Sequence, residues 1–346
     1  MKKIVFTLCS NNYLALAKVL VDSFFEHNQI QEYHFIIGLC DRKSDLINYN
    51  FFENCTIIEV EDLDIPNFQE MSLKYNIIEL NTFIKPYYFK YIFEKVGADL
   101  IYFLDPDIRI YNSFSIIEEE MFEYDILLTP HIQTPIPVDG YFPEEDTFLN
   151  YGLYNLGFLA LRKSPNTFKL LNWLSLKLEN KCFNNVSEGY FVDQLPMNFV
   201  PIFFDKVVIS NNFGLNMAYW NLHERKISII NGKNKINETE NLVFFHFSSF
   251  KPEKKDEISH FLTRFRMTDQ PLLKQLFDSY YERLMENKYL ELKNLPCFFV
   301  QRREEYLEKS RLMTLSKESV RKKIMRVVKR RMPQVINSKL SKYNQL

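Results

Sequence analysis

Short apolar runs alternate with stretches of helical periodicity from the fourth residue of this chain onward, and this alternation limits the folds open to it. The runs occupy residues 4–8, 35–39 and 56–60. Between the first two, apolar residues recur at helical spacing at Leu14, Ala17, Leu20, Val21 and Phe24. The runs are mostly apolar rather than alternating, which is typical of strands buried on both faces of a parallel sheet. The pattern predicts a β-α-β-α-β unit with helices on both sides of the sheet.

The same unit continues to about residue 130. Pro86 suits a first helical turn and Gly97 suits the residue after a helix end, so we expect a helix between them. Runs at residues 100–104 and 126–128 predict two further strands. Beyond them the pattern loosens, with frequent proline, asparagine and aromatic residues, until helical periodicity returns at about residue 257.

Glycine is scarce, with only 8 in 346 residues, roughly a third of the usual share of about 7%. No two glycines are spaced as G-x-G, and no G-x-x-x-x-G-K-[ST] is present. This excludes the dinucleotide-binding fingerprint and the P-loop. A nucleotide bound by this chain would therefore need a metal ion or fixed cations to meet its phosphate charge.

Charge and cysteine usage bound the setting of the protein. A formal charge of −1 gives no support to nucleic-acid binding, and we expect no such partner. The 5 cysteines lie far apart without a C-x-x-C, so we expect reduced cytosolic thiols rather than disulfides or a zinc knot. The apolar positions after Met1-Lys2-Lys3 are too few for a secretory signal, and no apolar stretch is long enough to span a membrane. These features predict a cytoplasmic protein.

Asp105-Pro106-Asp107 follows directly on the run at residues 100–104, so two carboxylates emerge together from the C-terminal end of a predicted buried strand. Ligands of open α/β sheets bind at that edge. Both carboxylates of a D-x-D pair can reach one hard cation, and carboxylate oxygens suit Mg²⁺ or Mn²⁺. The pair predicts a cation site that can bridge two phosphates, and a polar turn that closes the strand is the alternative.

Six segments, taken in order, resemble motifs of the GT-A-fold glycosyltransferases, specifically the broad bacterial group related to glycosyltransferase family 8. They are residues 5–8 with Ser10 and Asn11, Lys85-Pro86-Tyr87, Phe103-Leu104-Asp105-Pro106-Asp107, Tyr154-Asn155-Leu156-Gly157-Phe158, Asp193-Gln194, and Phe245-His246-Phe247 with Lys251-Pro252. Together they cover about residues 1–255. Two features depart from the family: His246 and Lys251 are five residues apart instead of six, and Ser249 stands where its glycine would be.

The resemblance implies a GT-A, Rossmann-like α/β fold with a mostly parallel central sheet flanked by helices. It implies a metal-dependent glycosyltransferase that moves a sugar from a nucleotide-diphosphate donor, best matched by a UDP-sugar. The acceptor would be a glycan or a lipid-linked molecule in the synthesis of a bacterial surface polysaccharide or lipopolysaccharide. Mn²⁺ or Mg²⁺ would be the cofactor, held by Asp105, Asp107 and His246. Family 8 relatives retain the anomeric configuration, which predicts a retaining transfer.

The resemblance also assigns roles to other residues. Those implied to bind the donor are Thr7, Ser10, Asn11, Lys85, Asn155, Gly157 and Lys251. Asp193 and Gln194 are implied to be catalytic, beside the anomeric carbon. An inverted product would instead give the base role to a carboxylate, namely Asp193, Glu144, Glu145 or Asp146. We expect Lys85 at the N-terminal end of the helix begun by Pro86. A cation at that end is unfavourable with the helix dipole, so a lysine there suggests that an anion such as the donor phosphate binds beside it.

Several of these residues also have a purely structural interpretation. His246 lies among phenylalanines, where a lone histidine is commonly a core residue. Asp193 suits a helix N-cap, and Asn155 with Gly157 suits a strand bulge. Trp220 lies outside the matched segments, and we expect its ring to stack on an acceptor sugar.

The charge distribution divides the chain into an acidic body and a basic C-terminal extension. The last 45 residues hold 14 basic and 4 acidic side chains, or +10 against −11 for the remainder. We expect a catalytic domain over 1–255 and a helical extension over 256–346. Within 316–332, apolar residues fall on one helical face at Val320, Ile324, Val327 and Val328. A basic helix of this kind is typical of a membrane interface, which predicts peripheral attachment to the anionic inner face of the cytoplasmic membrane. Packing on the acidic body or on a partner enzyme is the alternative.

Three other classes of function are alternatives. A phosphatase of the haloacid dehalogenase type also has a strand that runs into D-x-D, but that motif normally opens the chain, whereas here three predicted strands precede it. A sugar-nucleotide nucleotidyltransferase shares a related sheet, but it usually has a glycine-rich loop where this chain has Ser10-Asn11-Asn12. A non-enzymatic, membrane-associated assembly protein would use the basic extension. It would have no need of Asp105, Asp107 and His246 together.

Overall fold

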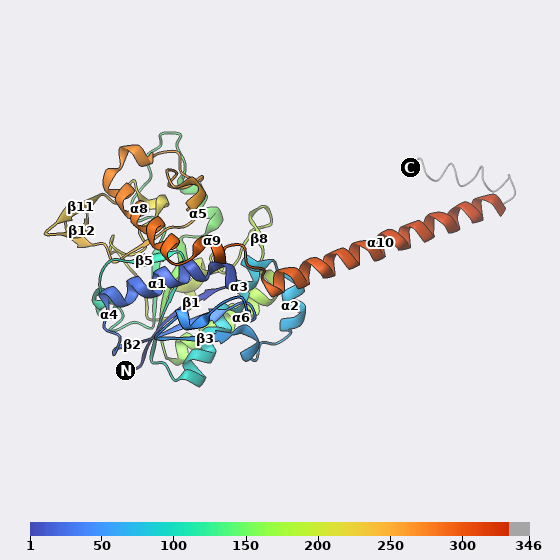
Figure 1. The fold of residues 1–346 in the computed structure, drawn as a ribbon, viewed down its shortest axis with the longest axis horizontal. Helices are drawn as coiled ribbons and strands as arrows, with labels where there is room; N and C mark the ends of the chain where they lie inside the picture. The colour runs from blue at the N-terminus through green and yellow to red at the C-terminus, as the bar shows by residue number, and fades with distance from the viewer. Residues whose placement is uncertain (332–346) are drawn as a thin grey trace. The chain divides into compact units, whose positions relative to one another are not determined.

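The computed structural model describes residues 1–331 (Figure 1), and of residues 319, 320 and 329–331 it describes only the backbone. The chain divides into two compact units, Met1–Phe299 and a second that begins at Val300. The first unit runs past residue 255, where the sequence suggested that the catalytic domain ends. The division of function at that residue stays a prediction.

A seven-stranded sheet lies at the centre of the first unit. Its strands, in spatial order, are β10 (Val207–Ile209), β6 (Ile126–Pro130), β7 (Tyr154–Arg162), β4 (Leu100–Leu104), β1 (Lys3–Cys9), β2 (Tyr33–Leu39) and β3 (Cys55–Glu59). All neighbouring strands are parallel except where β7 runs antiparallel between β6 and β4. The predicted α/β class with a mostly parallel central sheet is therefore confirmed.

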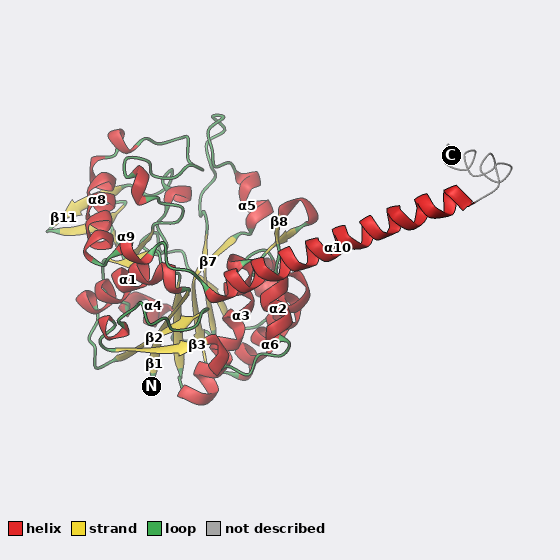
Figure 2. Ribbon diagram, turned by 45° about the vertical axis from the view of Figure 1, so that its right-hand side comes forward, coloured by secondary structure: helices red, strands yellow, loops and turns green. Residues whose placement is uncertain are grey.

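Helices cover both faces of this sheet, and alternate residues of each strand point toward opposite faces. Val5 belongs to the hydrophobic cluster that includes residues of α1 (Leu14–His27). The next residue, Phe6, instead stacks on Tyr88 of α3 (Ile77–Tyr91), with ring centroids 5.4 Å apart. Helix α6 (Pro165–Lys181) packs against α3 (Figure 2). Burial from both sides explains why the strands are continuously apolar in sequence.

The helix expected to begin at Pro86 begins at Ile77 instead. Asn76 and Glu79 form a capping box, in which each side chain accepts a hydrogen bond from the backbone N–H of the other. This box starts the helix upstream and leaves Pro86 in its interior. Lys85 consequently lies in the middle of α3, so the expected placement at a helix N-terminus, and the dipole argument for a bound anion, were wrong.

Other helices and strands complete the first unit. The helices are α2 (Phe68–Lys74), α4 (Ser115–Glu120), α5 (Glu145–Tyr151), α7 (Val200–Phe203), α8 (Pro271–Glu286) and α9 (Tyr289–Leu292). The strands pair as β5 (Ile108–Ile110) with β14 (Phe244–His246), β8 (Asn184–Asn185) with β9 (Tyr190–Phe191), and β11 (Ile227–Ile230) with β12 (Lys233–Ile236) and β13 (Glu240–Asn241). Gly97 ends the helical stretch after α3 with a φ of 78°, as the sequence predicted.

The described part of the second unit is the helix α10 (Phe298–Arg331) from Val300 onward. The predicted tail segment 316–332 is helical as far as Arg331, and its last residue, Met332, lies outside the described residues. Ile324, Val327 and Val328 are exposed on this helix. In the part of the chain that the structure describes, we find no helix with the length and hydropathy of a membrane span.

Candidate functional site

Asp105, Asp107 and His246 converge beyond the C-terminal end of β4. Their ligand atoms all lie within 4.8 Å of one another. The pairing of β5 with β14 sets His246 opposite Ile108, and the backbone N–H of Phe247 donates to the carbonyl of Asp107 at 2.9 Å. As a result, His246 Nε2 lies 3.0 Å from Asp107 Oδ1 and 4.0 Å from Asp105 Oδ2. A two-stranded ladder thus joins parts of the chain that are far apart in sequence.

Gly157 of β7 makes room for the ring of His246. Its carbonyl accepts a hydrogen bond from the backbone N–H of Asp105 at 2.7 Å. A Cβ atom at Gly157 would lie 2.3 Å from Cε1 and 2.7 Å from Nδ1 of His246. Non-bonded carbon atoms pack at about 3.5–4.0 Å, so any side chain at this position would displace the ring. The glycine of the predicted Asn155-Leu156-Gly157 segment therefore permits a close approach to a candidate ligand.

The electrostatics of the cluster favour a cation. Burial raises the pKa of Asp105 to about 6, against the opposing influence of Lys85 and His246. Its side chain nevertheless keeps 37% of its surface exposed, which leaves a face open to an incoming ion. Burial lowers the pKa of His246, but attraction to Asp107 and Asp105 outweighs it and the pKa is raised. Two carboxylates and an imidazole are a donor set that Mn²⁺ accepts readily.

Lys85 and Asp193 form a buried ion pair beside this cluster. Lys85 Nζ lies 2.8 Å from Asp193 Oδ2, and both side chains are less than a tenth exposed. The ammonium group also donates to the carbonyl of Leu156 at 3.3 Å and lies 4.4 Å from the ring centre of Phe103. Burial lowers the pKa of Lys85, while Asp193 and Asp105 raise it by more, so the lysine stays charged. Asp193 lies in a turn and caps no helix among the described elements.

Both the oxygen and the nitrogen of the Gln194 side-chain amide form hydrogen bonds within the protein. Its Oε1 accepts from the backbone N–H of Leu156 at 3.2 Å and from Asn155 Nδ2 at 3.3 Å, and its Nε2 donates to the carbonyl of Tyr151 at 2.7 Å. The nearby Val192 adopts a φ of 36°, a strained conformation for a β-branched residue. Such strain persists only where surrounding contacts fix the backbone, as they do at this turn.

A network of buried amides continues from Asn155. Its Oδ1 accepts from Gly157 N and from Asn216 Nδ2, each at 3.1 Å, and its Nδ2 lies 3.2 Å from His131 Nε2. Asn221 donates to the carbonyls of His131 and Asn216. Burial lowers the pKa of His131 to about 3, so this histidine is neutral. The network fixes the backbone that carries Gly157.

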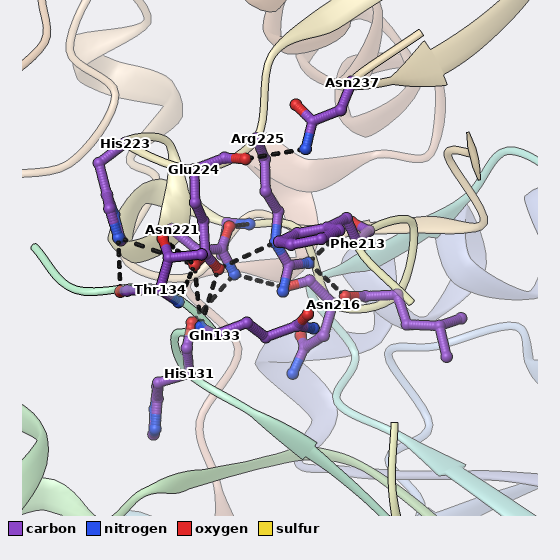
Figure 3. Close-up of polar contacts among 12 residues, drawn as sticks. His131, Gln133, Thr134, Phe213, Asn216, Asn221, His223, Glu224, Arg225 and Asn237 are labelled. Carbon is purple, nitrogen blue, oxygen red and sulfur yellow. Dashed lines mark hydrogen bonds and ion pairs between the residues drawn. The ribbon is translucent and has the colours of Figure 1, made fainter. Parts of the chain in front are cut away.

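Glu224 and Arg225 bind the loops that carry part of this network, and Figure 3 shows their polar contacts. The Glu224 carboxylate accepts from the backbone N–H of Gln133 at 2.9 Å and of Thr134 at 2.6 Å. Arg225 Nη1 donates to the carbonyl of Phe213 at 2.9 Å and also to that of Leu215. The two side chains lie 3.5 Å apart from Arg225 Nε to Glu224 Oε1 and are almost completely buried. They tie together the two loops that supply His131 and Asn216.

Trp220 is buried against the ring of His246. It is 4% exposed, and its ring meets the rings of His131 and His246 edge-on, at centroid distances of 5.2 and 5.3 Å. It packs with Phe148 in a small hydrophobic cluster. This position differs from the exposed platform that stacking on a sugar requires, and the acceptor role stays a prediction.

The predicted donor-binding residues occupy two kinds of environment. Thr7 is fully buried in β1, and its hydroxyl has no hydrogen-bond partner among the described residues. Ser10 donates to Asn12, while Asn11 donates to the carbonyl of Arg42 at 2.8 Å and accepts from the Tyr49 hydroxyl at 2.7 Å. Lys251, by contrast, is exposed. The structure therefore brings Asp105, Asp107, His246, Lys85, Asn155, Gly157, Asp193, Gln194 and Trp220 into one connected region.

Three residues of this region were not expected from the sequence. His131 directly follows β6, where a polar residue at the C-terminal end of a strand was a usable signal. Asn216 has a φ of 55°, which asparagine tolerates better than most residues, but no motif marks it. Tyr13 lies close enough to Asp107 and Asp105 for both to raise its pKa, after the larger effect of burial.

No protein-family model matches the chain. Two curated proteins of Bacillus subtilis (strain 168) are similar to it. The uncharacterized protein YfnF is 26% identical over 179 residues, which cover 51% of this chain and 57% of YfnF. The uncharacterized protein YfnD is 22% identical over 283 residues, which cover 79% of this chain and 86% of YfnD. The match thus spans little more than half the length of YfnF.

The chain is also similar to solved structures of glycosyltransferases. For the galactosyltransferase LgtC in complex with donor and acceptor sugar analogs, the identity is 14% and the TM-score 0.48, over 85% of this chain and 97% of that one. For the glycosyltransferase GlyE of Streptococcus pneumoniae TIGR4, the identity is 14% and the TM-score 0.46, over 86% of this chain and 66% of that one. For a glycosyltransferase involved in the glycosylation of the major capsid of PBCV-1, the identity is 11% and the TM-score 0.41, over 80% of this chain and 100% of that one.

Proposed function

We propose that this chain is a metal-dependent, retaining glycosyltransferase. Its donor is a nucleotide-diphosphate sugar, best matched by a UDP-sugar, and its acceptor is a glycan or a lipid-linked molecule. The setting is the synthesis of a bacterial surface polysaccharide or lipopolysaccharide. The observation that carries the proposal is the convergence of Asp105, Asp107 and His246 at the edge of a mostly parallel sheet. The six sequence segments that resemble family 8 enzymes support it.

The three convergent residues suit a divalent cation. Asp105 and Asp107 supply hard carboxylate oxygens, and His246 supplies Nε2, which points at Asp107 from 3.0 Å. The crowding of His246 against Gly157 indicates that the ring position is constrained rather than incidental. Mn²⁺ or Mg²⁺ bound there would stabilise negative charge on the diphosphate leaving group. The sequence has no glycine-rich phosphate loop, so this charge needs such a site.

The environment of Asp193 and Gln194 favours retention. Asp193 is buried and fixed by Lys85 at 2.8 Å, so its carboxylate is already committed to a cation. Gln194 holds its amide against Leu156 and Tyr151 and has no basic atom. A general base for inversion must lie within hydrogen-bond reach of the acceptor hydroxyl and be free to accept its proton. Neither side chain meets that description, and both instead shape the surface beside the cation site.

The basic part of α10 supports a peripheral position on the inner face of the cytoplasmic membrane. Arg321, Lys322, Lys323 and Arg326 are exposed, and so is Ile324 on the apolar face of the same segment. Each basic residue near an anionic leaflet contributes about 1 kcal/mol of attraction. Attachment through 316–332 would hold the enzyme beside a lipid-linked acceptor.

The test is slow hydrolysis of a panel of nucleotide sugars by the purified chain, with Mn²⁺, with Mg²⁺ and with EDTA. We expect one donor to be hydrolysed with either ion and not in EDTA. Asp107→Asn should abolish this activity with the fold intact, while Asp45→Asn, a matched change at an exposed carboxylate, should leave it unchanged. Full activity in EDTA or in Asp107→Asn would overturn the metal assignment.

Two further measurements separate the finer claims. NMR of the product reports its anomeric configuration, and an inverted product would refute retention. Release of pyrophosphate from a nucleoside triphosphate and a sugar phosphate would favour the nucleotidyltransferase alternative. Absence of any donor turnover, with no cation bound, would favour the non-enzymatic assembly protein.

A further inference from the structure

An exposed apolar patch lies on helices α6 and α7 and on the 3-10 turn Pro196–Phe199 that precedes α7, and the proposed function does not use it. We call it the α6–α7 patch, and it consists of Trp173, Leu176, Phe199, Ile202 and Phe203. Leu176 is 69% exposed, Ile202 77%, Phe203 55% and Phe199 50%. The rings of Phe199 and Phe203 stack at 5.2 Å, and Trp173 meets Phe203 edge-on at 5.9 Å, so these three residues form one surface. Leu176 lies three residues from Trp173 on α6, and Ile202 directly precedes Phe203 on α7. Contiguous apolar surface of this kind usually marks an interaction site.

Lysines border the patch along α6. Lys169, Lys177 and Lys181 follow the same helical stripe as Trp173, at intervals of four or eight residues. All three are exposed, and none forms an ion pair with a carboxylate among the described residues. The acid on this helix, Glu179, instead accepts a hydrogen bond from Asn67. The patch therefore combines apolar side chains with uncompensated positive charge.

A groove of about 340 Å³ runs through the patch. Its lining contains no acidic residue and consists of Trp173, Lys177, Lys181, Gly189, Tyr190, Phe191, Val192, Leu195, Pro196, Phe199 and Phe203. Val192 and Leu195 flank Asp193 and Gln194, so one turn of chain contributes to both the groove and the candidate site. The groove and the candidate site are consequently adjacent in sequence at residues 192–195.

We propose that the α6–α7 patch is a second membrane-docking surface and that its occupant is an anionic lipid bilayer. Aromatic and aliphatic side chains insert below the headgroups, and lysines at the rim meet the phosphates while their stems stay in the apolar layer. Tryptophan and tyrosine are enriched at that depth. A protein partner fits less well, because protein interfaces are depleted in lysine. Docking of this face would bring the turn at 192–195 toward a membrane-borne acceptor.

The test is sedimentation of the full chain with vesicles of phosphatidylcholine alone and with about 30 mol% phosphatidylglycerol, an assay that needs no enzyme activity. We expect binding to the anionic vesicles only. Leu176→Ser with Ile202→Ser should weaken binding at least tenfold, because two apolar side chains no longer insert into the bilayer. Both side chains are exposed, so the fold should stay intact. Lys177→Gln with Lys181→Gln should weaken binding by about fivefold per lysine. Leu46→Ser with Ile78→Ser, exposed apolar residues elsewhere, is the matched control.

The contribution of α10 is separated by a variant with glutamine at positions 321, 322, 323 and 326, alone and combined with the patch variant. Independent surfaces should give losses that multiply. Quenching by brominated lipid provides a local readout, since Trp173 lies in the patch and Trp220 is buried. Unchanged vesicle binding by both patch variants would overturn the proposal, and so would a wild type that ignores anionic vesicles. Loss of a dimer in the patch variants, with vesicle binding intact, would assign the surface to a second copy of the chain instead.

Discussion

Gly157→Ala is the sharpest perturbation that the structure offers, because it adds one carbon atom at a known place. That atom would lie 2.3 Å from Cε1 of His246. Carbon atoms pack at no less than about 3.5 Å, so the ring must retreat by about 1.2 Å. The alanine itself is compatible with an extended strand, and the backbone hydrogen bond from Asp105 N to Gly157 O is not removed. The change therefore acts first on the position of the imidazole, and it also presses on Asn155 Oδ1, which would lie 2.8 Å from the added atom.

The expected result is a large loss of cation affinity. Metal–ligand distances tolerate deviations of about 0.2 Å, so a shift of about 1.2 Å takes His246 out of the ligand set. Changes that merely misorient a ligand already cost about 10- to 100-fold in affinity, and loss of the ligand should reach at least about 100-fold. This corresponds to about 2.8 kcal/mol of binding free energy. Titration of Mn²⁺ by isothermal calorimetry, or by electron paramagnetic resonance of the free ion, measures it directly.

Gly38→Ala is the matched control. Gly38 also lies in a strand, and its added Cβ would meet Tyr88, Leu8 and Phe6 at 2.8–2.9 Å. These contacts are in the hydrophobic core, so we expect a lower free energy of unfolding and an unchanged Mn²⁺ affinity. Wild-type Mn²⁺ affinity in a folded Gly157→Ala chain would refute the reasoning, since His246 would then not be a ligand at its observed position.

Three further predictions follow from buried polar groups. Lys85→Met should lower the free energy of unfolding by about 3–5 kcal/mol in urea titrations, because Asp193 is left buried without its partner. Adding Asp193→Leu should recover much of this loss. No recovery in the double variant would contradict the ion-pair account. Burial lowers the pKa of His131 to about 3 in the folded chain, whereas in the unfolded chain this histidine has its usual pKa of about 6.5. Below about pH 6.5 the unfolded chain therefore binds a proton that the folded chain does not bind, so the free energy of unfolding decreases as the pH falls. Between about pH 7 and pH 5 the wild type should lose about 2 kcal/mol more than His131→Gln, and equal losses would show that His131 is not the cause. Glu224→Ala should cost at least about 3 kcal/mol in the same assay, because it leaves the buried Arg225 guanidinium without its carboxylate partner and the Gln133 and Thr134 N–H groups without an acceptor. The exposed Glu291→Ala should be almost neutral.

The sequence was informative wherever a single strand carried the signal. Continuous apolar runs predicted the central strands, because a strand buried on both faces has no polar positions to interrupt it. Asp105 and Asp107 were predictable for the same reason, since two carboxylates at the end of such a strand must lie at the sheet edge. Gly97 indicated a helix end because few other residues tolerate a φ of 78°.

The rest depended on contacts between distant segments or on weak local signals. Asn76 and Glu79 start α3 through reciprocal hydrogen bonds, but in the sequence this pair is far less conspicuous than Pro86, which suggested a later start. The pairing of β5 with β14, which brings His246 to Asp107, has no sequence marker, and only the family resemblance suggested it. Asn216 and Glu224 have no marker at all, because a buried polar residue is defined by partners that only folding supplies.

The scarcity of glycine takes on a physical meaning at the candidate site. Some of the few glycines stand where two groups come closer than a side chain allows, as at Gly157 against His246 and at Gly214 against the carbonyl of Asn241. The sequence has no glycine-rich loop for phosphate recognition, and the open carboxylate face of Asp105 offers an alternative through a bound cation. Meanwhile Asn155 and Gln194 use their amides on each other and on the backbone. Their hydrogen bonds hold rigid the strand on which Gly157 and the cation site depend, so we infer that these amides position the site even where they do not touch a substrate.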